Sequence, residues 1–178
     1  MVIDDLVGQA LAFGFSHASL LDAGTLTLRS EVRDMCAAGR CGMYNKSWVC
    51  PPACGTLEEI AGKLAGYTRG LIVQTTAELE DEFDFDGMKE ASELQRERFY
   101  AFGKELVGHW PAMLSLGGGS CKKCETCTWP DEPCRRPGEV FMSMEAAGLV
   151  VSDVCASNGI AYYYGPKTLT YTSCYLLE

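Results

Sequence analysis

The strongest constraint on this chain is a short run in which three cysteines recur at equal steps, Cys121, Cys124 and Cys127, with Cys134 after a proline. Ferredoxin-type chains hold a 4Fe–4S cubane with a C-x2-C-x2-C run and one further cysteine, because one tight loop can then present three thiolates to three irons. Zinc sites more often use C-x2-C pairs separated by a longer stretch. The run therefore favours an iron–sulfur site.

The fourth cysteine departs from the ferredoxin pattern. Six residues separate Cys127 from Cys134, and the proline precedes the cysteine instead of following it. We expect the longer gap to let the chain return, so that Cys134 closes the same cluster. Gly118 and Gly119, just before the run, are expected to bring backbone amides close to the sulfurs, with a flexible hinge as the alternative.

A second set of four cysteines lies within nineteen residues, comprising Cys36, Cys41, Cys50 and Cys54. Four cysteines make a complete ligand set, but this spacing is not that of a ferredoxin. An all-cysteine zinc site is therefore the strongest alternative here. Trp48, between these cysteines, is expected to shield the metal group from water, unless it is simply an exposed aromatic of a small loop.

Two of the ten cysteines, Cys155 and Cys174, lie outside both sets and are expected to be buried structural residues. The N-terminus carries Asp4 and Asp5 and has no basic region, so it does not resemble a signal peptide. We therefore expect a cytoplasmic protein whose cysteines bind metal instead of forming disulfides.

The composition is that of an ordinary globular protein, with 178 residues, 47% hydrophobic and 22% charged. We expect one domain over residues 1–178, with metal-binding loops at about 36–54 and 121–134. No apolar stretch approaches the roughly 20 residues of a membrane span. The net charge of −9 argues against a nucleic-acid surface.

The cations are unevenly distributed along this acidic chain. Seven of the fifteen lie among the cysteines, namely Arg33, Arg40, Lys46, Lys122, Lys123, Arg135 and Arg136. They would either offset the charge of metal-bound thiolates or be solvated loop residues.

Helical periodicity predicts a helix over residues 3–13 and a long helix over 84–110. Thr56 and Glu59 form a capping box that predicts a third helix, and a fourth is expected over 143–157, with a break at Gly148. Residues 35–55 are expected to form a loop.

Apolar runs predict strands at 18–21, 71–73 and 113–116, and a C-terminal β-hairpin of 160–164 and 168–177. The fold class expected is α/β or α+β, with a mixed sheet flanked by helices and the two cysteine-rich loops attached to it.

Three segments, CGMYNKSWVCPPAC, LGGGSCKKCETCTWPDEPCRRP and SMEAAGLVV, occur in this order along the chain. Together they resemble the predicted metal-binding protein family known as domain of unknown function 2284, from about Cys36 to the C-terminus. The resemblance implies one metal site on each cysteine set and an iron–sulfur protein of anaerobic bacteria and archaea. It implies no established reaction.

The interpretation favoured by the sequence is a protein with two 4Fe–4S clusters that passes single electrons to a redox partner in anaerobic metabolism. On this interpretation it is an electron carrier and not an enzyme. One alternative is a redox enzyme, or an activator of a corrinoid or other anaerobic enzyme, that uses a cluster with an open iron. The other is a structural module with all-cysteine zinc sites. The sequence identifies no catalytic residue, partner or oligomeric state.

Overall fold

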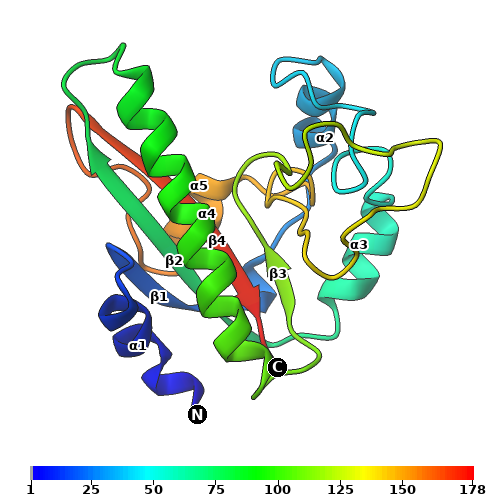
Figure 1. The fold of residues 1–178 in the computed structure, drawn as a ribbon. Helices are drawn as coiled ribbons and strands as arrows, with labels where there is room; N and C mark the ends of the chain where they lie inside the picture. The colour runs from blue at the N-terminus through cyan, green and yellow to red at the C-terminus, as the bar shows by residue number, and fades with distance from the viewer. Residues whose placement is uncertain (1) are drawn as a thin grey trace.

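The computed structural model describes residues 2–178, which form a four-stranded antiparallel sheet with helices on both faces (Figure 1). The strand order is β1-β2-β4-β3, and the strands are β1 (His17–Asp22), β2 (Arg69–Glu78), β3 (Leu114–Leu116) and β4 (Thr168–Leu176). The helices are α1 (Leu6–Phe13), α2 (Ser30–Ala37), α3 (Leu57–Leu64), α4 (Phe85–Val107) and α5 (Val151–Ser157). Short 3-10 helices precede α1 (Ile3–Asp5) and follow β1 (Ala23–Thr25).

Alternating side chains of the central strands build one core on each face of the sheet. On one face, Leu71 and Tyr175 pack with Phe99 and Phe102 of α4 and with residues of α1. On the other, residues of β2 and β4 pack against α3 and α5. Each large apolar side chain fully buried in this way stabilises the fold by about 1.5–3 kcal/mol. The sheet therefore forms a rigid base for the loops at its edge.

Local sequence signals set several helix ends, although α4 ends at Val107 and not at residue 110 as predicted. Thr56 and Glu59 form the capping box that opens α3, and the Asp84 carboxylate accepts the Gly87 N–H at 2.9 Å at the start of α4. Gly14 ends α1 with a φ of 117°, a left-handed conformation that glycine adopts without strain.

The α+β class is confirmed, but two details of the prediction are wrong. The sheet is antiparallel throughout and not mixed. Residues 160–164 form no strand, so there is no C-terminal hairpin. Strand β4 pairs with β2 on one side and β3 on the other, which leaves it no edge for a hairpin partner. Tyr164 instead stacks on His17, with ring centroids 3.8 Å apart.

Two helix boundaries also differ from the prediction. Helix α2 occupies part of the segment expected to be a loop, so Cys36 lies in its last turn. The helix expected over 143–157 exists only as α5, and the chain before it turns at Gly148. A Cβ on Gly148 would lie 2.6 Å from Leu57 Cδ2, and its φ is 95°, so the chain approaches α3 closely there.

Both cysteine-rich loops gather beyond the β3 edge of the sheet (Figure 1). Strand β3 leads directly into the second loop, and Gly117 fixes its start through backbone hydrogen bonds with Met142 and Met144. No helix within residues 2–178 is long and apolar enough to cross a membrane.

Candidate metal centre

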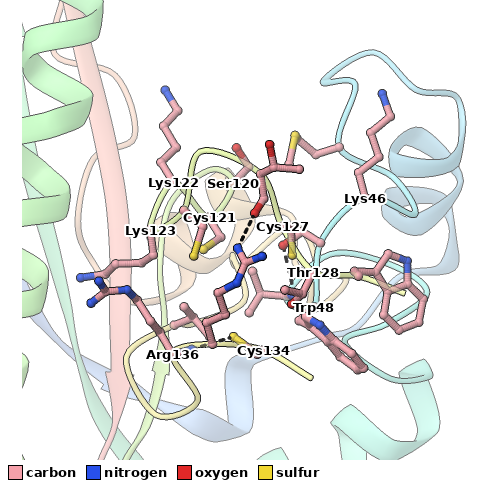
Figure 2. Close-up of a pocket in the computed structure, with 18 of the residues that line it drawn as sticks. Lys46, Trp48, Ser120, Cys121, Lys122, Lys123, Cys127, Thr128, Cys134 and Arg136 are labelled. Atoms are coloured by element: carbon pink, nitrogen blue, oxygen red, sulfur yellow. Dashed lines mark hydrogen bonds between the residues drawn. The ribbon is translucent and has the colours of Figure 1, made fainter. Parts of the chain in front are cut away.

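The four cysteines of the second set, Cys121, Cys124, Cys127 and Cys134, all line one cavity of about 530 Å³ (Figure 2). All four are partly exposed, and none of the ten cysteines forms a disulfide. The cavity wall also includes residues 45–49 of the first loop. The second cysteine set is therefore enclosed by both loops, although some seventy residues of sequence separate them.

Two tryptophans join the loops. Trp48 and Trp129 pack edge to face with ring centroids 4.7 Å apart. The Trp48 indole N–H donates to the Glu132 carbonyl at 3.1 Å, and the Trp129 indole N–H donates to Asn45 Oδ1 at 3.0 Å. An edge-to-face aromatic pair contributes about 0.5–1.5 kcal/mol beyond its area. The two loops are thus held by reciprocal contacts.

Cys127 is the thiol most favoured to ionise. Partial burial acts to raise its pKa, but the backbone N–H groups of Trp129 and Trp48, the Ser47 hydroxyl and the Thr128 N–H outweigh this and lower the pKa. Hydrogen-bond donors stabilise a thiolate more than a thiol. Two of these donors, from Trp48 and Ser47, belong to the first loop. The first loop therefore helps to lower the pKa of a thiol in the second set.

The first cysteine set is also brought together. Burial, together with the nearby charges of Cys54, Cys41 and Cys36, raises the pKa of Cys50 to about 11. Cys36 is affected in the same way, by burial and then by Cys41. Thiols that repel one another as thiolates stay protonated at neutral pH, so binding of a metal cation to this set would release protons.

Arg33 supports the first set. Its Nη1 donates to Cys54 Sγ at 3.3 Å, and its Nη2 donates to the Gly55 carbonyl. Burial raises the pKa of Cys54, and the Arg33 guanidinium opposes that rise. Its Nε–H is buried and has no hydrogen-bond partner among residues 2–178. Leaving a buried donor without an acceptor costs free energy of folding. A bound anionic group rich in sulfur would supply the missing acceptor.

Ser47 connects the two sets. Its side chain is buried, and its hydroxyl lowers the pKa of both Cys50 in the first set and Cys127 in the second. Ser47 also lines the cavity of the second set and lies three residues before Cys50 of the first set.

Within residues 2–178, no three or more histidine, cysteine, aspartate or glutamate side chains converge on a point where a single metal ion could bind. In a cubane each thiolate binds a different iron, so the four sulfurs stand around the cluster and not at one point.

The structure gives the other predicted residues specific places. Trp48 lines the cavity of the second set. A Cβ on Gly118 would lie 3.2 Å from the Thr172 carbonyl of β4, and Gly119 has a φ of 72°. These two glycines are therefore explained by close packing and backbone conformation, and an amide contact from them to a sulfur stays a prediction.

Cys155 and Cys174 are fully buried in the core between the sheet and α5, as expected. Burial raises the pKa of Cys174 to about 12 and also raises that of Cys155. Both are neutral thiols at physiological pH. Gln74 Nε2 lies 3.5 Å from Cys155 Sγ and also donates to Thr172 Oγ1, so this region is a satisfied polar cluster within the core.

Sequence reasoning did not find Ser47, Asn45 or Trp129. The signal available for the tryptophans was a tryptophan close to a cysteine in each loop, Trp48 before Cys50 and Trp129 after Cys127. Arg33 was noted only as one of several cations near the cysteines.

The fold and the two thiol sets define a cysteine-rich metal-binding protein of α+β architecture. The model of the family described as "Predicted metal-binding protein (DUF2284)" matches residues 19–177, so the chain belongs to this family. The matched region includes both cysteine sets. Searches of curated proteins and of solved structures found no match to the chain.

Proposed function

We propose that each cysteine set holds one 4Fe–4S cluster and that the protein passes single electrons to a partner protein in anaerobic metabolism. On this proposal it is a single-domain electron carrier of the cytoplasm and not an enzyme. The observation that carries the proposal is that all four thiols of the second set, which has the ferredoxin-like spacing, line one cavity.

The donor chemistry fits such clusters. The eight ligands are thiols, and soft thiolates suit iron–sulfur clusters and zinc alike. Hydrogen bonds to sulfur tune a cluster's reduction potential. Several donors of this kind lie at Cys127, and Arg33 donates to Cys54. The unpaired Nε–H of Arg33 adds a further donor at the first set.

Each cluster, when bound, would supply a site that accepts and releases one electron. The chain's own residues would do the rest. Cys36, Cys41, Cys50 and Cys54 would hold one cluster and Cys121, Cys124, Cys127 and Cys134 the other. The paired tryptophans would keep water from the second site. Ser47 lines the cavity of the second set and lies three residues before Cys50 of the first, which supports transfer between the sites.

The first experiment is purification without oxygen, followed by analysis of iron, sulfide and zinc and by EPR before and after dithionite. Two cubanes predict about eight iron and eight sulfide per chain and a signal of the reduced cubane. About two zinc and no sulfide would overturn the proposal in favour of a structural module with all-cysteine zinc sites.

A further inference from the structure

Cations surround the cavity of the second cysteine set. Five line it, against a single carboxylate, Glu125, and they are Lys46, Lys122, Lys123, Arg135 and Arg136. Four of these five side chains are exposed. In a chain with a net charge of −9, this concentration is unusual.

The positive region extends onto helix α4. A second, more open hollow of about 660 Å³ adjoins the first, because Lys122 and Lys123 line both. It adds Arg96 and Lys104, together with two carboxylates of α4. The two hollows hold seven of the chain's fifteen cations and only three of its twenty-four carboxylates. We call this region the basic face.

A bound cluster would not neutralise this charge. A cubane with four thiolates carries a net charge of about −2. The cations of the cavity exceed its carboxylates by four, so a positive excess would remain after the cluster is bound. The positive charge of the cavity therefore exceeds what is needed to balance the bound thiolates.

The lysines at the cavity mouth are free to meet a partner. Figure 2 shows Lys46 and Lys122, from different loops, extending on the same side of the cavity. Among residues 2–178 neither forms an ion pair, and of the five cavity cations only Arg136 does, with Glu139 at 3.3 Å. Lys123 is different, since its Nζ lies 3.7 Å from the centre of the Tyr100 ring and is held there.

Outside the basic face the chain carries twenty-one carboxylates against eight cations. The acidic segment over residues 78–86 lies at the far end of α4 from the cysteine loops (Figure 1). An acidic partner would be repelled by that end and attracted by the basic face, so it would approach with the second site foremost.

We propose that the basic face docks an acidic partner protein, a one-electron carrier, over the cavity of the second cysteine set. This rests on the proposed function, because it names the charge and kind of the redox partner. Charges at the rim of such a contact act mainly on the association rate and on its salt dependence.

The test is a binding titration of the full, metal-loaded chain with an acidic ferredoxin as the probe, at low and at moderate salt. Basic cytochrome c is the control of opposite charge. The charge-reversal variant is Lys46→Glu/Lys122→Glu. The matched control, Lys89→Glu/Lys167→Glu, makes the same change in net charge away from the cysteine loops. Circular dichroism and metal content are measured for each variant.

We expect the ferredoxin to bind at low salt and to weaken steeply as salt screens the contact. We expect the Lys46→Glu/Lys122→Glu variant to lose roughly tenfold or more in affinity and the control roughly twofold or less. Equal losses in both variants, salt-independent binding, or tighter binding of cytochrome c would overturn the proposal. Metal analysis reports separately on the proposed function. Clusters without ferredoxin binding would overturn the docking site alone, whereas zinc without sulfide would overturn the proposed function and the redox partner with it.

Discussion

Trp48 and Trp129 pack edge to face, and each indole N–H donates to the loop that carries the other ring. This contact connects segments that are separated in the chain by α3, β2, α4 and β3. It closes the cavity of the second set on the side of the first loop. The stability of any metal group in that cavity should therefore depend on both rings.

Replacing Trp48 with phenylalanine tests this dependence. The ring contact is largely kept, but the hydrogen bond to Glu132 is lost, which costs about 1 kcal/mol. We expect a chelator to remove iron from the second site roughly fivefold faster. The measurement is the anaerobic rate of iron loss. Trp110→Phe is the control, because Trp110 is partly buried and packs against the core on the α1 and α4 face. An equal acceleration there would contradict the role of the tryptophan pair.

Ser47→Ala should loosen both sites, since the Ser47 hydroxyl acts on Cys50 and Cys127. We expect faster iron loss from each site when it is measured alone, in chains whose other site is disabled by Cys124→Ser or Cys54→Ser. Ser120→Ala is the matched control, as Ser120 also lines the cavity. If Ser47→Ala altered only one of the two sites, the serine would not connect them.

Arg33→Met should lower the reduction potential of the first site without removing its iron. The substitution deletes a positive charge and a donor to Cys54 Sγ, both of which favour the reduced, more negative state. Arg33→Lys should have a smaller effect, because lysine keeps the charge but cannot make the forked contact. A redox titration followed by EPR in the Cys124→Ser chain gives the potential. An unchanged potential in Arg33→Met would show that the arginine has only a structural role.

Cys124→Ser should remove about half of the iron, because it breaks one of two cubanes.

Cys174→Ala should leave the iron content intact and lower the free energy of unfolding by about 1–2 kcal/mol, since a fully buried sulfur is lost from the core. Iron analysis and denaturant unfolding separate the two effects. Loss of iron in Cys174→Ala would mean that the buried thiol takes part in metal binding.

Asp84 gives a prediction on pH. The N–H groups of Gly87 and Glu80 donate to its carboxylate and lower its pKa from 3.8. A lowered folded-state pKa stabilises the fold above the unfolded pKa, and this contribution is lost as pH falls through the folded value. We therefore expect Asp84→Ala to lower Tm at neutral pH and to differ less from the wild type well below pH 3.8. A Tm difference that does not change with pH would exclude this role for the carboxylate.

Much of the fold follows from local signals in the sequence. The Thr56 capping box and the apolar run around Leu71 predicted their elements correctly because each signal acts within a few residues. The prediction of a C-terminal hairpin was wrong because strand pairing depends on which strand edges are free. Strands β2 and β3 occupy both edges of β4, and the sequence of residues 160–164 does not show this. Helix α2 was missed because Cys36 and the glycine after it favoured a loop.

The site was predictable in part. Cysteine spacing marked the eight candidate ligands and separated them from Cys155 and Cys174. The contacts of Ser47 and of Trp48 with the second loop were not predictable, because they depend on how two loops meet that are distant in the chain. Arg33 is an intermediate case. Its charge near the cysteines was evident, but its partner Cys54 lies 21 residues away and no local pattern identifies it.

The donors to Cys127 have a consequence for protein engineering. Residues 117–137 contain every cysteine of the second set, and their spacing suggests a motif that could be transplanted into another scaffold. Such a transplant would omit two of the four groups that favour the thiolate of Cys127, because Trp48 and Ser47 belong to the other loop. The smallest portable unit is therefore the pair of loops, and any design that borrows this motif must carry both.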